Sequence, residues 1–173
     1  MARKYGPIMQ NGYLVEDIDA AAEHWTRAIG VGPFFKITGL KFKELYLRGA
    51  PAKIDMEVAL AYWGDMQIEL LKQNCDNETV YSDFRRQKTS GLHHVGVETQ
   101  DLDGAVAELA ALGCPPIWHG EAENGTRFAY VASDHHPGAM LELISLSPPI
   151  KEAFKAMKRA AETWDGRTTF ASF

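Results

Sequence analysis

Hydrophobic and polar residues follow the same order at two places in the chain. Residues 10–30 read QNGYLVEDIDAAAEHWTRAIG, and residues 94–114 read HVGVETQDLDGAVAELAALGC. Each stretch opens with a few strand-like residues, continues with D-x-D, and then shows apolar residues at helical spacing before a glycine. Asp17 and Asp101 hold the same place in the two copies, and each is a favourable N-cap. The pattern predicts a repeated strand–helix unit.

Strand-like stretches follow each of the two predicted helices. They cover residues 34–37, 41–49 and 54–73 in the first copy, and 115–122, 127–134 and 139–147 in the second. The stretch 54–73 predicts a hairpin that turns at Gly64 and Asp65. The two copies end alike, with MQIELL and AMLELI, which places Glu69 over Glu142.

These elements predict an α+β fold of two tandem βαβββ modules. The modules form a cupped mixed sheet with the helices outside, and a C-terminal helix follows. Residues 1–173 are expected to be a single domain, divided into a first module at 6–74, a linker with a short helix at 75–90, a second module at 91–147, and a C-terminal helix and tail at 148–173. The last helix has an apolar stripe that includes Phe154 and Met157, which predicts packing on the sheet or on a partner chain.

Composition excludes several classes of function. The chain is 46% hydrophobic and 24% charged with a net charge of −5, which is typical of a globular protein and unfavourable for binding nucleic acid. Its apolar runs are too short to span a membrane, and the first residues do not resemble a signal peptide. Cys75 and Cys114 form neither a disulfide framework nor a C-x-x-C motif. We therefore expect a cytoplasmic protein that binds neither nucleic acid nor membrane.

Two adjacent histidines, His93 and His94, open the first strand of the second unit. Neighbouring residues of a strand point to opposite faces, so at most one of them should face a given pocket. The repeat makes His94 equivalent to Gln10, which predicts that His94 faces the cup and that His93 points the other way.

Alternation in the last strands places two acids in the same cup. Ile68 and Leu70 are expected to face the helices, which turns Glu69 toward the cup, and the repeat gives Glu142 the same direction. Gln10, Glu69, His94 and Glu142 are thus expected to converge.

Buried carboxylates are costly unless they are paired, protonated or bound to a metal. Two carboxylates, an imidazole and an amide oxygen suit one divalent ion such as Zn, Ni, Co, Mn or Fe. The alternative is a polar floor in which the acids pair with arginine or lysine.

Other cup-facing positions are candidates for contact with a substrate. If Gly64 and Asp65 form a two-residue turn, Tyr62 lies opposite Gln67 and Leu60 lies opposite Glu69. Met140, on the same face as Glu142, completes this set of expected substrate-binding residues. In addition, His135 and His136 precede the last strand, where they either line the mouth of the cup or, as is usual for histidines in loops, face the solvent.

The paired modules, the strand–D-x-D–helix starts and the IELL and LELI endings resemble the vicinal oxygen chelate superfamily. This superfamily includes glyoxalase I, methylmalonyl-CoA epimerase, extradiol dioxygenases and bleomycin-resistance proteins. The resemblance covers about residues 6–147 and is greatest to the glyoxalase-like and methylmalonyl-CoA-epimerase-like branch. It implies metal ligands at Gln10, Glu69, His94 and Glu142. Gln10 and Glu69 depart from the epimerase pattern, which usually has His and then Gln at these two places.

The resemblance implies a redox-neutral isomerase, epimerase or lyase that acts on a small substrate with vicinal oxygens. The metal would act as a Lewis acid and a carboxylate would move a proton, with Glu142 the first choice of base and Glu69 the second. An Fe(II) dioxygenase and a non-catalytic binding or resistance protein are the alternatives. A homodimer is expected, because proteins of this type often pair.

Overall fold

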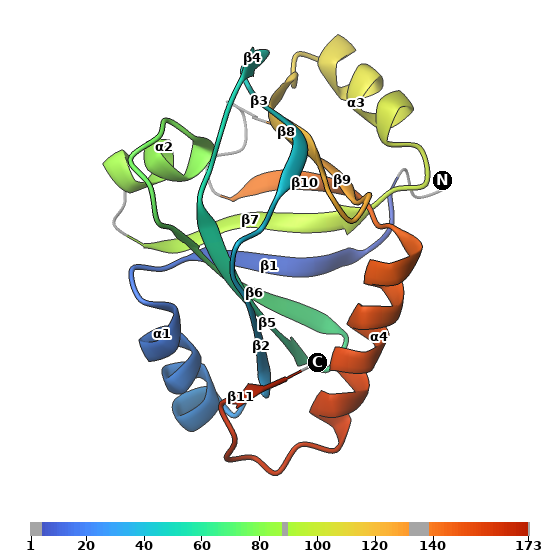
Figure 1. Ribbon diagram of the computed structural model, residues 1–173. Coiled ribbons are helices and arrows are strands. Elements are labelled where there is room, and N and C mark those ends of the chain that lie inside the picture. The colour runs from blue at the N-terminus through green and yellow to red at the C-terminus, as the bar shows by residue number, and fades with distance from the viewer. Residues whose placement is uncertain (1–4, 88–89, 132–138, 173) are drawn as a thin grey trace.

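The computed structural model describes residues 5–87, 90–131 and 139–172, and in these residues eleven strands form one continuous sheet. The strand order is β11-β2-β5-β6-β1-β7-β10-β9-β8-β3-β4. At its centre β1 (Ile8–Leu14) pairs antiparallel with β7 (Gly91–Glu98). On either side of this pair, the sheet bends around a common interior (Figure 1).

The two halves of the sheet repeat one strand order. In the first half β1 is followed across the sheet by β6 (Met66–Gln73), β5 (Met56–Trp63) and β2 (Phe34–Ile37). In the second half β7 is followed by β10 (Met140–Ser145), β9 (Arg127–Val131) and β8 (Pro116–Ala122). The α+β fold with two βαβββ units is therefore confirmed.

The local signals behave as the sequence predicts. Asp17 caps α1 (Ile18–His24) by accepting a hydrogen bond from the amide of Ala20, and Asp101 caps α3 (Leu102–Ala111) by accepting one from Gly104. A π-helical turn (Trp25–Ile29) extends α1. The β5–β6 hairpin turns at Gly64 and Asp65, so Tyr62 pairs with Gln67 and Leu60 with Glu69.

One strand departs from the predicted arrangement. Residues 41–49 were assigned to the first module, but β3 (Phe42–Leu47) crosses to the other half and pairs with β8. A short hairpin with β4 (Ala50–Pro51) then forms the edge of the sheet. The first copy has one strand more than the second, and in the first half β6 and β2 already pair with the two edges of β5.

Helices cover the outer face of each half. In α1, Ile18 and Ala22 pack against Ala59 of β5 and Ile68 of β6. Leu102 and Ala105 of α3 pack in the same way against Ala129 and Leu143 in the second half. The linker helix α2 (Val80–Gln87) contributes Val80 and Tyr81 to the interior of the cup.

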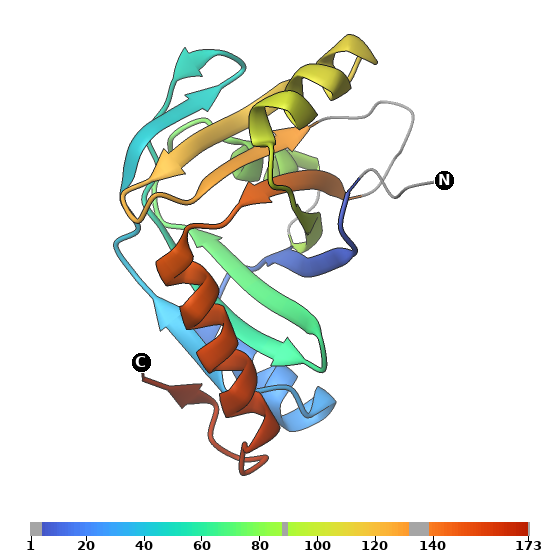
Figure 2. The ribbon, with the colours of Figure 1, turned by 90° about the vertical axis from the view of Figure 1, so that its right-hand side faces the viewer.

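The C-terminal helix α4 (Pro148–Glu162) lies on the opposite face of the first half from α1. Its Met157 packs against Leu60, whereas α1 packs against the neighbouring residue Ala59. Figure 2 shows α4 running along the concave side, after which β11 (Phe170–Ala171) pairs with β2. The helix therefore packs on the sheet, inside the cup. In the described part of the chain, no helix combines the length and apolar character that crossing a membrane requires.

Candidate functional site

The central strand pair contains a β-bulge at the two histidines. Gly12 pairs with His94 and Tyr13 pairs with Leu92, so His93 is an extra residue on β7. A bulge interrupts the regular alternation of side chains along the strand. The Nδ1 atoms of His93 and His94 lie 3.2 Å apart, and both rings contact Tyr130. The expectation that His93 points away from His94 is therefore wrong, because it assumed an unbroken strand.

Four predicted side chains meet at one atom of His94. Its Nε2 lies 3.2 Å from Oε2 of Glu69, 3.2 Å from Oε2 of Glu142 and 3.4 Å from Oε1 of Gln10. His94 is fully buried, and Gln10 and Glu142 are nearly so. Within the described ranges no lysine or arginine pairs with either carboxylate, so the polar floor neutralised by arginine or lysine is not observed.

Two glycines make room for this cluster. A Cβ on Gly12 would lie 2.0 Å from Cε1 of His94, so the imidazole packs directly over the backbone of β1. Gly96 lies under Gln10 in the same way, with a Cβ 2.9 Å from Oε1. Gly12 lies two residues after Gln10 on β1 and pairs with His94 of β7. Gly96 lies two residues after His94 on β7 and pairs with Gln10 of β1. Sequence reasoning aligned Gly12 with Gly96 but assigned them no role.

Gln10 is oriented by a chain of hydrogen bonds. Its Nε2 donates to Oε1 of Gln67 at 2.7 Å, and Nε2 of Gln67 donates to the hydroxyl of Tyr62 at 3.2 Å. This pairing leaves Oε1 of Gln10 as the atom that faces His94.

Burial and the neighbouring charges shift the pKa values of His94 and Glu69 in opposite directions. Burial lowers the pKa of His94, but the charges and hydrogen bonds of Glu142 and Glu69 outweigh it and raise this pKa to about 9. Burial also raises the pKa of Glu69, with the nearby Glu142 adding to the rise against the effect of His94. For His93, burial and the neighbouring His94 lower the pKa to about 3, so its ring stays neutral. The environment of the cluster therefore favours the protonated form of His94.

The donor set fits a divalent metal ion. In the structure both carboxylates contact Nε2 of His94 directly. Among the described residues, no three or more His, Cys, Asp or Glu side chains are arranged so that they could hold a metal ion between them. Neighbouring ligands around an ion at 2.0–2.2 Å are about 2.8–3.6 Å apart. The separations of 3.2–3.4 Å between Nε2 of His94 and the three oxygens lie in this range, which fits one ion shared by His94 and these oxygens.

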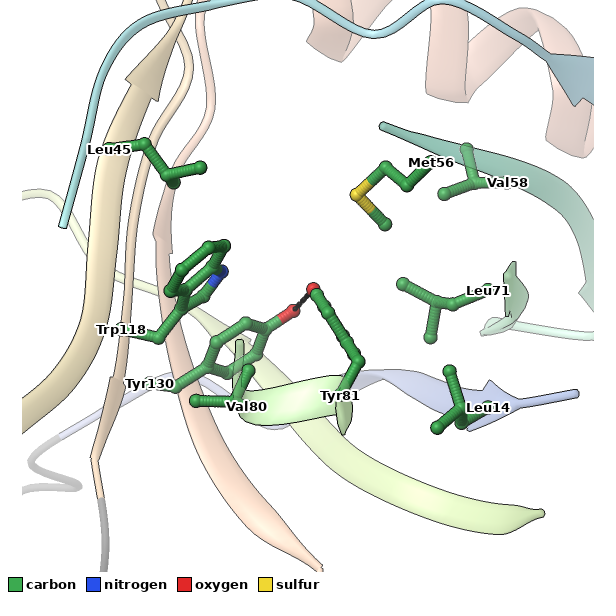
Figure 3. Close-up of a cluster of buried hydrophobic side chains, with 9 residues drawn as sticks. All are labelled: Leu14, Leu45, Met56, Val58, Leu71, Val80, Tyr81, Trp118 and Tyr130. Carbon is green, nitrogen blue, oxygen red and sulfur yellow. Dashed lines mark hydrogen bonds between the residues drawn. The ribbon is translucent and has the colours of Figure 1, made fainter. Parts of the chain in front are cut away.

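A cavity of about 160 Å³ opens above the cluster. Gln10, Glu69 and Glu142 border it, and its remaining wall is mostly apolar. Figure 3 shows Leu45 and Trp118 facing Met56 and Val58 across the interior, with the hydroxyls of Tyr81 and Tyr130 meeting between them. These two hydroxyl oxygens are 3.2 Å apart, and both side chains line the cavity.

The predicted substrate-binding residues take different positions. Leu60 lines the cavity, whereas Tyr62, Gln67 and Met140 are not part of the described lining. Tyr62 packs beside α4, Gln67 is buried under Gln10, and Met140 packs against the core. Tyr62 and Gln67 are on the predicted face of the sheet, but Gln67 is hydrogen-bonded to Gln10 and Tyr62, and Tyr62 packs beside α4. His135 and His136 lie outside the described residues.

Sequence reasoning missed several residues of the site. Tyr81 was placed in a linker, and Tyr130 in a strand without distinguishing features. Ile150 and Phe154 of α4 also line the cavity. The amphipathic spacing of α4 predicted that it packs on the sheet or on a partner chain. Spacing alone does not identify the face of the sheet on which the helix packs.

Comparison with known proteins places the chain in a family. Residues 9–130 match the family described as the Glyoxalase/Bleomycin resistance protein/Dioxygenase superfamily. No curated protein matches the chain. Because the match covers more than half of the sequence, the chain belongs to this superfamily.

Solved structures share the fold at low sequence identity. Methylmalonyl-CoA epimerase from Mycobacterium tuberculosis has a TM-score of 0.62 at 17% identity, over 88% of this chain and 97% of that chain. A hypothetical protein from Bacillus halodurans C-125 has a TM-score of 0.60 at 16% identity, over 82% and 94%. Methylmalonyl-CoA epimerase in complex with methylmalonyl-CoA and NH4+ has a TM-score of 0.60 at 16% identity, over 84% and 97%. At these identities the similarity concerns the fold.

Proposed function

We propose that this member of the superfamily is a metal-dependent, redox-neutral isomerase, epimerase or lyase that acts on a small substrate with vicinal oxygens. The observation that carries the proposal is the convergence of Gln10, Glu69 and Glu142 on Nε2 of His94 at the floor of a cavity. The epimerases of the same fold support an isomerase-type reaction.

The four side chains would hold one divalent ion, such as Zn, Ni, Co, Mn or Fe. When bound, this ion would supply Lewis-acid stabilisation of the negative charge that develops on a carbonyl oxygen. Two carboxylates and two neutral ligands balance the charge of a divalent cation. This balance would remove the cost of burying Glu69 and Glu142 without a lysine or arginine partner.

Glu142 is the proposed base. Its carboxylate borders the cavity, where it would remove a proton from the carbon next to the carbonyl and return it to the other carbon or the other face. Glu69, on the opposite side of His94, is the second candidate. Tyr130 pairs with Glu142 across the β9–β10 ladder, so its hydroxyl would orient a substrate oxygen beside the base.

Metal content per chain, measured by plasma mass spectrometry, tests the proposal. We expect about one divalent ion in the wild type and its loss in His94→Ala and Glu142→Ala. Glu57→Gln is the matched control, because Glu57 lies on the strand next to Glu69 but pairs with Lys36 and Lys72 on the outer face. Absence of metal from the wild type after reconstitution would overturn the mechanism and leave a binding protein.

Oxygen consumption separates the reaction classes. A redox-neutral enzyme shows no substrate-dependent O2 consumption in any metal form, whereas O2 uptake by the Fe(II) form that requires the substrate would establish the dioxygenase alternative. The set of one histidine, one glutamine and two glutamates differs from the two-histidine, one-carboxylate site of Fe(II) oxygenases.

The protein is also proposed to be a homodimer. Ile8, Trp63 and Leu92 are large apolar side chains left 39–58% exposed on the strands, and contact with a second copy would bury apolar surface of this kind. Light scattering coupled to size-exclusion chromatography would measure the mass in solution. A mass of about 19.2 kDa, that of one chain, would contradict this assembly.

A further inference from the structure

Most of the cavity wall is apolar, and several elements contribute to this apolar part. Val58 and Leu60 come from β5, Trp118 from β8, Phe128 from β9, and Phe154 from α4. The described lining includes no lysine, arginine or histidine. Its only ionisable groups besides the tyrosines are Glu69 and Glu142.

The polar groups away from the carboxylates are neutral. The hydroxyl groups of Tyr130 and Tyr81 share a hydrogen bond, and a phenol hydroxyl is an uncharged donor and acceptor. Asn124 and Thr126 are the other polar residues of the lining besides Gln10 and the carboxylates. Hydroxyl and amide groups bind a neutral oxygen well, but they do not neutralise a carboxylate or a phosphate.

Cations of the neighbouring elements are engaged elsewhere or face the solvent. Arg48 pairs with Asp83, and Lys151 on α4 pairs with Glu98. Lys41 precedes the lining residue Phe42 but is exposed. A substrate anion inside the cavity would therefore lose its hydration without gaining a cation of the described chain, which is costly.

The cavity volume indicates the size of the substrate group that it can enclose. The cavity measures about 160 Å³. An apolar protein cavity of roughly 150 Å³ accepts benzene. One six-membered ring, or an aliphatic group of similar size, would fill the space between the two walls in Figure 3.

We propose that the substrate is an uncharged carbonyl compound with vicinal oxygens and an apolar body of about one ring. Its oxygens would face Glu142 and the tyrosine hydroxyls, and its body would lie against Trp118, Val58 and Phe154. This inference rests on the proposed function for the reacting end, and it adds the exclusion of substrates that place an anionic group inside the cavity.

Matched ligands test the charge and the apolar body separately. The metal-reconstituted protein is titrated with 2-hydroxy-4′-methylacetophenone and with 4-(2-hydroxyacetyl)benzoate, which differ only in a methyl or carboxylate group far from the vicinal oxygens. Hydroxyacetone lacks the ring, and methylmalonyl-CoA represents an acyl-CoA. Calorimetry or the fluorescence of the buried Trp118 reports binding.

We expect the methyl compound to bind at least 100-fold more tightly than the benzoate and at least tenfold more tightly than hydroxyacetone. Phe154→Lys places an ammonium group in the wall and should reduce the 100-fold preference to tenfold or less. Ala156→Lys adds the same charge at an exposed position of α4 and should leave the preference unchanged. Equal binding of the methyl and benzoate compounds, or tighter binding of methylmalonyl-CoA, would overturn the inference.

The two proposals fail in different ways. If metal is bound and lost in His94→Ala, but methylmalonyl-CoA is the preferred ligand, the proposed function survives and the substrate class is wrong. If no metal binds but the neutral aromatic compound is still selected, the cavity selects as inferred and the enzymatic mechanism is wrong.

Discussion

Substitution of Gly12 by alanine should displace the imidazole of His94. The added Cβ would lie 2.0 Å from Cε1 and 2.4 Å from both Nδ1 and Nε2. The shortest ordinary contact of such a carbon is 3.4 Å, so the ring or the strand must move by about 1.4 Å. A shift of this size breaks the contacts of 3.2–3.4 Å that hold the cluster together.

The magnitude follows from overpacking and from the loss of one ligand. Overpacking a tight interior costs about 1–3 kcal/mol of unfolding free energy. Perturbing the neighbours of metal ligands costs about 10–100-fold in metal affinity, and displacing a ligand itself should exceed that range. We expect the metal Kd to rise at least 100-fold, equivalent to about 2.7 kcal/mol.

Urea unfolding of the metal-free protein and metal titration of the folded protein measure the two effects. Gly6→Ala is the control, since its Cβ would meet only the carbonyl oxygen of Glu98 at an ordinary 3.5 Å. Gly96→Ala should have a smaller effect, because its nearest contact is the amide end of Gln10 at 2.9 Å.

Combining Gly12→Ala with His94→Ala distinguishes this clash from a general folding defect. Removing the ring removes the clash, so the double variant should be more stable than the sum of the two single effects predicts. The double variant should still not bind metal. Additive losses of stability, or a Gly12→Ala protein that binds metal like the wild type, would refute the reasoning.

Three further predictions concern the ligands, the metal and the surface. Gln67→Leu removes the acceptor that orients Gln10, so metal titration should show a loss of affinity of about 10–100-fold with little change in fold; unchanged affinity would remove Gln67 from the site. Treatment with a chelator should lower the thermal unfolding midpoint of the wild type but not that of His94→Ala, since only the first has bound metal to lose. Lys158→Ala should leave the urea midpoint unchanged although Lys158 pairs with Asp65, because both groups are exposed; a measurable drop would contradict this.

Much of the site was readable from local patterns. Alternation in MQIELL and AMLELI placed Glu69 and Glu142 on the inner face, because consecutive residues of a regular strand point to opposite sides. The repeat then added Gln10 and His94 as equivalent positions. The structure brings these four side chains to one point, and their role as metal ligands remains a proposal.

The positions of His93 and β3 required the tertiary structure. The bulge at His93 arises from the register between β1 and β7, whose paired residues are far apart in sequence. Pairing of β3 with β8 also joins residues far apart in sequence, because β2 and not β3 pairs with β5. Neither interaction leaves a signal in a short window of sequence.

The sequence by itself determined the repeated units, their helix caps, the hairpin at Gly64 and the inner-facing acids, because each depends on residues close together in the chain. Only the tertiary structure decided that α4 lies inside the cup and that the cavity wall lacks cations in its described lining. Those properties arise where side chains from β5, β8 and α4 meet, and the order of residues along one element does not specify what faces it.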